Sequence, residues 1–372
     1  MDWISFAEII LVFILGWNIS AAVLPRISLV SFRCRLFDQV DSRKIHTDPI
    51  PRLGGIAFFP CILVSVSLVI ECHYLCVGKN LLNMDLATHL LSLFSGLFVL
   101  YLMGMMDDLI GVRYRSKFIL QVVCGVLLVA SGLCFDNFYG VFGISDIPQW
   151  VGRPFTVLVI VFIMNAINLI DGIDGLASGL SIIAFIAFGC MFSILGWWVY
   201  SFLAFSALGV LIPFFYYNVF GKVRRGRKIF MGDTGSLTIG MLLAAMAIRL
   251  SMTDAVKDAT FPGAIVIAFS FLMVPMLDVV RVIIHRLRIG KNPFLPDKNH
   301  IHHKFMKLGM PQHQAMICIV GIAAVFAIFN VLSIHQISAT AMFLIDISVW
   351  TVMHILITVK INKLQTVRAE QQ

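Results

Sequence analysis

The chain has 372 residues, of which 59% are hydrophobic and only 13% are charged. An ordinary water-soluble domain is excluded, because so apolar a chain would leave large hydrophobic patches in contact with water. The 28 Lys and Arg residues outnumber the 20 Asp and Glu residues and give a net charge of +8. The sequence therefore predicts an integral membrane protein with a basic surface.

Apolar runs long enough to cross about 30 Å of hydrocarbon as helices recur along the chain. The first run is followed by its basic residues, from Arg26 onward, and is therefore interpreted as a membrane span and not as a cleavable signal. The fold class is expected to be all-α, with about eleven transmembrane helices in one polytopic domain covering residues 1–372. The expected spans are 3–25, 53–71, 87–106, 118–135, 153–170, 177–195, 198–217, 236–250, 262–284, 314–333 and 338–358.

The distribution of Lys and Arg predicts which side of the membrane each loop faces, because these residues stay cytoplasmic near span ends. With the N-terminus outside and the C-terminus cytoplasmic, 24 of the 28 Lys and Arg residues fall inside. Such a one-sided charge favours anionic lipid headgroups and phosphorylated substrates over nucleic acid, for which the sequence shows no basic module. The cytoplasmic loops that carry motifs are expected at 26–53, 107–117, 168–179, 218–236 and 281–313.

The few acids, amides and histidines of this chain gather at the predicted inner ends of the spans. Because an ionisable group is costly in lipid, such gathering indicates function. Five separate loops are therefore expected to contribute to one aqueous face. The clusters lie at 43–46 with 51–55, at 107–108, at 165–175, at 232–236 and at 297–303.

At the end of the fifth span, Asn165, Asn168, Asp171 and Asp174 are spaced by three, which aligns their side chains along one helical strip. Amide and carboxylate oxygens so arranged can hold a hard cation such as Mg2+. The alternative is a helix end solvated by polar residues, with nearby glycines serving close helix packing. The metal or substrate interpretation is preferred, because four such groups border hydrocarbon.

Adjacent Asp107 and Asp108 close the third span, and two neighbouring carboxylates repel unless they share a cation or a proton. The alternative is a simple interfacial stop for the span.

The segment from Gly232 to Ser236 opens the eighth span, where small residues let backbone N–H groups approach an anion. Its alternative is a glycine turn with an Asp cap.

His300, His302 and His303 lie beyond the ninth span in a loop with Asp297. Histidines can bind zinc, act as acid or base, or donate hydrogen bonds to a diphosphate. Zinc is disfavoured, because no thiolate lies beside them and the local charge is cationic. A solvated basic loop is the alternative.

Two other acids have plainer interpretations. Asp278 precedes Arg281 by three residues and is expected to form an ion pair with it. Asp346 lies deep in the last span and is expected either to function or to face a polar neighbouring helix. Pro213 and Pro275 are expected to kink their helices.

Carboxylates for a cation, cationic loops for phosphates and a membrane scaffold together indicate phosphoryl transfer between a soluble nucleotide and a lipid phosphate. The five motifs, in this order, resemble those of the polyprenyl-phosphate N-acetylhexosamine-1-phosphate transferases, in the WecA-like branch. The resemblance spans roughly residues 40 to 310. It rests on Arg43 to His46 with Pro51 to Gly55, on Asp107 and Asp108, on Asn165 through Gly175, on Gly232 to Ser236 and on Pro296 through His303.

The resemblance implies that UDP-N-acetylglucosamine gives its sugar-1-phosphate to undecaprenyl phosphate. It further implies that UMP is released and that the product initiates surface polysaccharide synthesis. The implied location is the bacterial inner membrane, with the active site facing the cytoplasm, surrounding lipids as partners and a homodimer left open. The implied cofactor is Mg2+, with Mn2+ as an alternative.

The resemblance also assigns roles by motif. Asn168 and Asp233 are the implied metal ligands, Asp107 or Asp108 binds or deprotonates the acceptor phosphate, and Asp174 contacts uracil. The three histidines hold the diphosphate and sugar. The implied catalytic residues are Asp107, Asp108, Asp171, His302 and His303, and the implied substrate-binding residues are Lys44, His46, Arg52, Gly54, Gly55, Lys117, Asn165, Asp174, Asp297 and His300.

Two departures from the family pattern matter. Some relatives carry a lysine where this chain has Gly111, with basic residues only at Arg113, Arg115 and Lys117, so the cation that guides the acceptor stays open. The histidine motif reads His-Ile-His-His, as in the N-acetylglucosamine branch. UDP-N-acetylglucosamine therefore ranks first as donor, and another UDP-N-acetyl sugar or UDP-MurNAc-pentapeptide ranks second.

Two other classes of membrane protein are weaker alternatives. An intramembrane prenyltransferase would need a second aspartate-rich motif, which the sequence lacks. A secondary transporter would place its acids at mid-membrane, where Asp346 is the main candidate.

Overall fold

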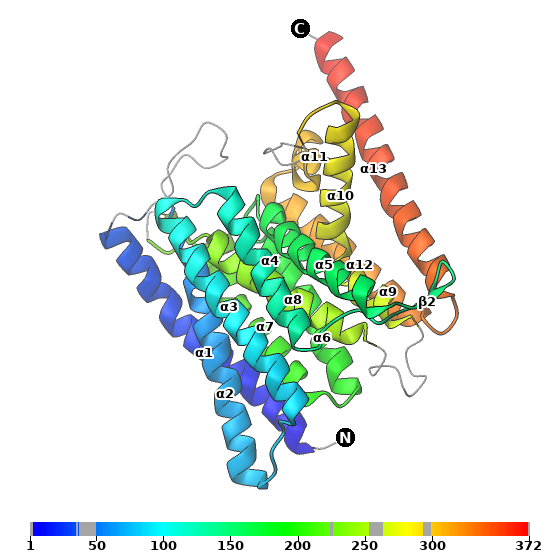
Figure 1. Ribbon diagram of the computed structural model, residues 1–372. Helices are drawn as coiled ribbons and strands as arrows, with labels where there is room; N and C mark the ends of the chain where they lie inside the picture. Colours follow the sequence, from blue (N-terminus) through cyan, green and yellow to red (C-terminus); the bar gives the residue numbers. More distant parts are fainter. Residues whose placement is uncertain are drawn as a thin grey trace.

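The computed structural model describes residues 3–34, 36, 50–223, 226–252, 263–292 and 299–370. These residues form a long bundle of helices with one small hairpin (Figure 1). The helices are α1 (Trp3–Arg33), the 3-10 helix η1 (Gly54–Ala57), α2 (Phe58–Val77), α3 (Met84–Ile110), α4 (Tyr114–Ala130), α5 (Gln149–Ile170), α6 (Leu176–Ile194), α7 (Trp198–Phe220), α8 (Gly232–Leu250), α9 (Ala264–Ser270), α10 (Met273–Arg288), α11 (Ile301–Lys307), α12 (Gln312–Ser333) and α13 (Ala339–Glu370). The antiparallel hairpin consists of β1 (Asn137–Val141) and β2 (Ile144–Asp146).

The expected all-α membrane class is confirmed. Within the described ranges, nine helices are long and apolar enough to cross a membrane, and α9 with α10 forms a tenth candidate that is bent by 79°. Helix α4 has 17 residues and covers about 25 Å as a helix, slightly less than the hydrocarbon thickness. The chain is thus a multi-pass membrane protein.

Contacts between helix ends show that α4 and the α9–α10 pair also run from one end of the bundle to the other. Lys117 near the start of α4 contacts Asp107 at the end of α3, whereas the Phe135 N–H after α4 donates to Thr156 near the start of α5 (2.9 Å). At that same far end, the Tyr139 hydroxyl donates to the carbonyl of Ser251 after α8 (3.2 Å). The chain must therefore return through α9 and α10 before α11 reaches the Lys117 end.

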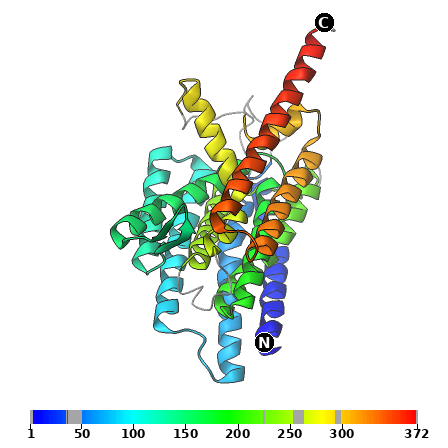
Figure 2. The same cartoon turned by 90° about the vertical axis from the view of Figure 1, so that its right-hand side faces the viewer.

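The described residues thus hold nine or ten candidate spans, and the number of eleven stays a prediction. The ends of the described chain lie at opposite ends of the molecule (Figures 1 and 2). The side of the membrane on which each end lies stays a prediction. The hairpin was not predicted from the sequence. It lies beside the start of α13, where the Phe142 N–H donates to Thr340 (3.0 Å).

Helix α8 packs against α3, α5 and α6 and is buried along most of its length. Small residues allow the close approach: a Cβ atom on Gly104 of α3 would lie 2.4 Å from the Thr234 Cα, and one on Gly240 would lie 2.8 Å from the Met164 Cα. This packing fixes the first turn of α8 between the ends of α3 and α5.

The two prolines that were expected to kink their helices lie at different positions in those helices. Pro275 lies in the first turn of α10, directly after the 79° bend, where a missing N–H is tolerated. Pro213 lies inside α7, which continues without interruption from Trp198 to Phe220. Pro213 therefore does not break its helix, and a kink at this position stays a prediction.

Asp346 has a buried partner, as the second of its two interpretations required. The Asn330 amide of α12 donates to its carboxylate at 3.2 Å. Trp350 and His354 follow on the same face of α13 at four-residue spacing, and all four side chains are buried. This face packs inward against α12.

Candidate active site

Lys117 joins two carboxylates that come from different helices. Its Nζ atom lies 3.0 Å from Oδ2 of Asp107, at the end of α3, and it also contacts Oδ2 of Asp233, in the first turn of α8. The amide of Asn168, at the end of α5, donates to the other oxygen of Asp233 (3.1 Å) and to the Ser236 hydroxyl (2.8 Å). Three helix ends and α4 therefore meet around one cation.

These side chains are neither sealed nor fully solvated. The exposed fractions are 19% for the Lys117 side chain, 17% for Asp107 and 23% for Asp233. A charged ligand can therefore reach the group, while the reduced screening strengthens the attraction between opposite charges. The arrangement can bind a phosphate through Lys117 and a cation through the carboxylates.

Asp108 has a different environment from its neighbour. Its Oδ1 atom accepts the N–H of Asp233 (2.8 Å), and its Oδ2 atom accepts the N–H (3.0 Å) and the hydroxyl (2.6 Å) of Thr234. Both carboxylate oxygens are thus engaged by the first turn of α8, where a negative charge also complements the helix dipole. Asp108 holds Asp233 in place.

The segment around Arg52 pairs with the chain just before α8. The Phe230 N–H donates to the Pro51 carbonyl (2.8 Å), and the N–H groups of Gly54 and Gly55 donate to the carbonyls of Phe230 and Met231 (both 2.9 Å). A Cβ atom on Gly55 would lie 2.1 Å from the backbone nitrogen of Gly235, so only glycine allows this approach.

The loop between α5 and α6 carries Asp171 and Asp174. The Asp174 carboxylate is paired with Lys228, which lies before α8. The N–H of Gly175 donates to the side chain of Asn218 on α7 (2.6 Å), and the Asn218 amide donates to the Ile229 carbonyl (2.9 Å). Asn218 thereby ties this loop to the segment that leads into α8.

Asp171 lies close to other charges. The surrounding protein and the Asp174 charge raise the pKa of Asp171 to about 7, against the opposing effect of Arg52, although the side chain keeps contact with solvent. A carboxyl group with this pKa can exchange a proton near neutral pH.

The histidines begin α11 and are anchored by Asp278 of α10. One oxygen of this fully buried carboxylate lies 2.8 Å from Nδ1 of His300, and the other accepts the Ile301 N–H (3.0 Å) and the Arg281 guanidinium (2.8 Å). The predicted pair of Asp278 and Arg281 is therefore present, and the same carboxylate also positions the histidine loop. We refer to residues 299–304 as the histidine arm.

His302 brings the histidine arm against the loop that carries Asp171. A Cβ atom on Gly172 would lie 2.4 Å from the Nε2 atom of His302. The ring centroids of His300 and His302 are 5.9 Å apart, and those of His302 and His303 are 4.2 Å apart. Burial and the two neighbouring histidines lower the pKa of His302 to about 3, so its ring is neutral at physiological pH.

Most of the predicted site residues that the structure describes meet at this end of the bundle. Asn165 differs from the others in its hydrogen-bond partners, because its amide donates to the buried Gln121 side chain of α4 (2.7 Å) and to a carbonyl of its own helix. The predictions for Lys44, His46 and Asp297 lie outside the described residues. Assigned roles stay predictions for all of them.

Three contributors to this site were missed. Lys228 ends a run of basic residues that begins at Lys222, Asn218 follows an aromatic stretch without a motif of its own, and Gln121 is a single polar residue in an apolar span. A polar residue buried in a predicted span was the one signal that pointed to Gln121.

The oxygen donors around Asp233 suit a metal that needs few protein ligands. The described residues contain no group of three or more His, Cys, Asp and Glu side chains that could hold a metal by themselves. Mg2+ needs few protein ligands, because it keeps waters and binds substrate phosphates. Asp233 and Asn168 fit such a site, provided that the Asn168 amide turns its oxygen toward the ion.

Comparison with known proteins identifies the family to which this chain belongs. A model of glycosyl transferase family 4 matches residues 90–251. A Bacillus subtilis (strain 168) protein named "Probable undecaprenyl-phosphate N-acetylglucosaminyl 1-phosphate transferase" is 31% identical over 323 residues, which cover 86% of this chain and 84% of that protein. The chain belongs to glycosyl transferase family 4.

Two further relatives are both named undecaprenyl-phosphate alpha-N-acetylglucosaminyl 1-phosphate transferase. The protein from Escherichia coli (strain K12) is 29% identical over 315 residues, covering 82% of this chain and 78% of its own length. The protein from Yersinia pestis is 30% identical over 309 residues, with the same two coverages of 82% and 78%. The resemblance seen in the five motifs is thus confirmed.

The match to the glycosyl transferase family 4 model contains every residue that meets around Lys117 and ends before the histidine arm. The shared part of the family therefore includes the carboxylates, Asn168 and the first turn of α8.

Proposed function

We propose that the chain transfers N-acetylglucosamine-1-phosphate from UDP-N-acetylglucosamine to undecaprenyl phosphate, releasing UMP and giving a lipid-linked sugar diphosphate. The names of its relatives support this reaction. The observation that carries it is the Lys117 ammonium between Asp107 and Asp233, with Asn168 on the second carboxylate. This group offers both a cation for an acceptor phosphate and oxygen ligands for a metal.

On the acceptor side, since Gly111 stands where some relatives carry a lysine, we assign the role of the guiding cation to Lys117. Its ammonium attracts the lipid phosphate, and Asp107 holds the ammonium and can accept a proton from a monoanionic phosphate. Because these side chains lie at the ends of spans, a polyprenyl tail can stay in the bilayer while its phosphate reaches them.

On the donor side, the histidine arm faces the loop of Asp171 and Asp174. The neutral His302 ring presents hydrogen-bonding groups without carrying charge, and its Nδ1 atom is buried without a hydrogen-bond partner among the described residues. We assign the diphosphate and sugar to this arm and the uracil to the vicinity of Asp174. Lys228 then balances the Asp174 charge beside the nucleotide.

Mg2+, held by Asp233 and Asn168, would neutralise charge on the donor diphosphate and so make phosphorus accessible to an anionic acceptor. Without such neutralisation, two phosphate anions would repel each other at the site. Removal of divalent ions by a chelator is expected to abolish turnover, and Mg2+ is expected to restore it.

We place the site on the cytoplasmic side of a bacterial inner membrane, in agreement with the Lys and Arg distribution. UDP-sugars are then available from the cytosol. Another UDP-N-acetyl sugar is the second candidate donor, since the described residues that carry the proposal, Lys117, Asp233 and Asn168, are assigned to the phosphates and the metal and not to the sugar.

The test uses the purified chain with undecaprenyl phosphate, Mg2+ and radiolabelled UDP-N-acetylglucosamine. A labelled butanol-extractable lipid and released UMP are expected, and the Asp233→Asn variant is expected to form neither while remaining folded. Asp85→Asn is the matched control, because Asp85 is exposed at the opposite end of α3. Absence of labelled lipid with every UDP-N-acetylhexosamine would refute the proposal.

A further inference from the structure

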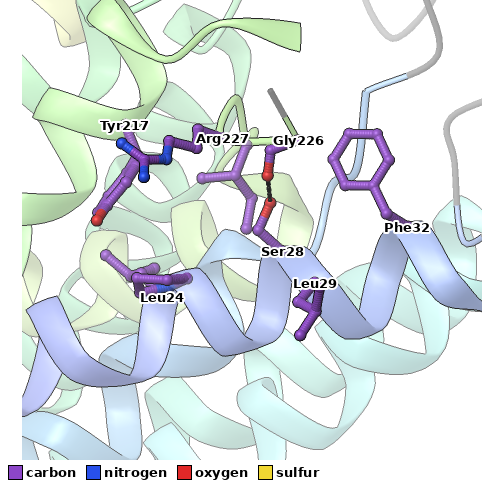
Figure 3. Close-up of a pocket in the computed structure, with 9 residues that line it drawn as sticks. Leu24, Ser28, Leu29, Phe32, Tyr217, Gly226 and Arg227 are labelled. Carbon is purple, nitrogen blue, oxygen red and sulfur yellow. Dashed lines mark hydrogen bonds between the residues drawn. The ribbon is translucent and has the colours of Figure 1, made fainter. Parts of the chain in front are cut away.

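A pocket lies between α1, the end of α7 and the segment before α8. It has a volume of about 250 Å3, below the range of about 300 to 1,000 Å3 that is common for sites of drug-sized ligands. Figure 3 shows α1 forming its floor, with Tyr217 and Arg227 across from Leu24. The lining residues are Leu24, Pro25, Ser28, Leu29, Phe32, Tyr217, Gly226, Arg227 and Ile229.

The position of α1 sets the depth of this pocket. Helix α1 has 31 residues and is therefore roughly 46 Å long, well beyond the roughly 30 Å of hydrocarbon in a bilayer. The pocket lies along its last turns, from Leu24 to Phe32, which therefore reach the headgroup layer. Leu29 is 51% exposed at this level, so the apolar side of the pocket opens toward lipid.

The chemistry of the pocket is divided. The α1 side is apolar, whereas Tyr217 and Arg227 line the other side (Figure 3). Among the described residues, Arg227 forms no ion pair, in contrast to Lys228, which is paired with Asp174. The Ser28 hydroxyl is already used, because it donates to the Gly226 carbonyl (2.7 Å). The charged group available to a ligand in this pocket is therefore the Arg227 guanidinium, a cation.

The segment that supplies Arg227 is basic in sequence, which favours an anion as ligand. Residues 218–236 contain five Lys and Arg residues and one acid, Asp233, which is held by Lys117 and Asn168. An exposed guanidinium at headgroup depth, next to an apolar wall, complements a phosphate with an attached acyl chain.

We propose that this pocket binds an anionic phospholipid, with the headgroup phosphate on Arg227 and Tyr217 and the first part of an acyl chain along α1. The acceptor lipid is not the expected occupant, because the pocket is built from α1, α7 and residues 226–229, whereas the carboxylate group is built from α3, α4, α5 and α8. The site is therefore separate from the one that carries the proposed chemistry.

A bound phospholipid would steady the segment that leads into the active site. The pocket wall at Ile229 is linked through Asn218 to Gly175, at the end of the loop that carries Asp174. Lys228, between two wall residues, is the partner of Asp174. Anionic phospholipid is thus expected to raise activity by stabilising this segment.

The binding test uses the full chain in mild detergent, with phosphatidylglycerol or phosphatidylcholine of identical acyl chains added, and counts retained lipids by native mass spectrometry. Phosphatidylglycerol is expected to be retained at least about fivefold better than phosphatidylcholine. Arg227→Gln is expected to remove this preference. The matched control is Arg26→Gln, an exposed α1 cation at the same depth that does not line the pocket.

A second variant tests the apolar half without a change of charge. Leu29→Trp is expected to fill the mouth of the pocket and to reduce retention of phosphatidylglycerol. Equal retention by wild type and Arg227→Gln would overturn the proposal. So would displacement of the lipid by inorganic phosphate alone, or an Arg227-dependent preference for undecaprenyl phosphate over phosphatidylglycerol.

The lipid measurement needs no turnover, so its outcome is independent of the proposed reaction. In the transferase assay, phosphatidylglycerol is expected to stimulate wild type and Arg26→Gln by at least about twofold and to leave Arg227→Gln unstimulated. A lipid that binds without stimulating would confirm the site and refute the link to the Asp174 loop.

Discussion

Gly172 lies directly against the imidazole of His302, so that a Cβ atom at this glycine would stand 2.4 Å from Nε2. This approach joins the α5–α6 loop to the histidine arm, two segments that are far apart in the sequence. The donor side of the proposed site depends on their contact.

Gly172→Ala is expected to push the histidine arm away and to reduce kcat/KM at least about tenfold, because small displacements of positioning groups are costly in catalysis. The measurement is the transferase rate, with the thermal unfolding midpoint as a check on folding. Gly321→Ala is the control, since its Cβ would meet no atom within 4 Å. Unchanged rates in Gly172→Ala would show that the arm does not need this contact.

Lys117→Gln is expected to reduce kcat at least about 100-fold, the magnitude typical for loss of a charge-stabilising donor. The two carboxylates it holds would then repel each other, and the acceptor phosphate would lose its cation. Lys117→Arg is expected to recover part of the rate.

Arg115→Gln serves as the control for Lys117, because Arg115 lies on the same helix and donates to the exposed Tyr114 side chain. Steady-state kinetics with varied undecaprenyl phosphate would separate the two effects of Lys117. A loss confined to the donor KM would contradict its assignment to the acceptor.

Asp108→Ala is expected to destabilise the protein by about 1 to 2 kcal/mol, since it removes the cap of α8. Asp107→Ala is the comparison, because Asp107 accepts from Lys117 and the Val112 N–H and does not contact α8's first turn through hydrogen bonds. Asp107→Ala is expected to abolish activity with a smaller change in unfolding midpoint. The reverse order of stabilities would exclude a capping role for Asp108.

The raised pKa of Asp171 predicts a pH-dependent stability. A carboxyl group with a pKa of about 7 in the folded state and its ordinary value when unfolded binds more protons folded, so stability falls as pH rises between these values. Asp171→Asn removes this dependence. Relative to the unfolding midpoints of Asp171→Asn, those of wild type are expected to fall as pH rises from about 4 to about 7, and parallel profiles would contradict the shift.

That the site residues lie together could be predicted, because spans that alternate in direction bring the polar residues at their inner ends to the same membrane interface. Asp107, Asn168, Asp233 and His302 were expected together on this ground, and they meet at one end of the bundle. Their individual partners could not be predicted, because hydropathy gives the depth of a residue and not its neighbour.

Asp107 and Asp108 show this limit most clearly. Successive residues of a helix point about 100° apart, so one carboxylate turns to Lys117 and the other to α8. Likewise, the spacing of Asn165 and Asn168 places them on one strip but does not reveal that Asn165 meets Gln121 on α4.

The broken ninth span was hidden for a related reason. The apolar run continues through Phe271 and Leu272, so hydropathy gave no sign of the 79° bend between α9 and α10. The hairpin of β1 and β2 was hidden because it is short and carries no alternating buried face.

The order of the segments that build the site has a consequence for biosynthesis. The segment of Gly55 packs against Gly235 and can do so only after Gly235 has been synthesised. Once α8 is inserted, Asp107, Lys117, Asn168 and Asp233 are all present. A nascent chain halted after Leu250 would therefore already contain the proposed acceptor group around Lys117 and the loop of Asp171 and Asp174, whereas the histidine arm arrives only with α10 and α11. Translation thus separates in time two parts of the site that the finished molecule holds side by side.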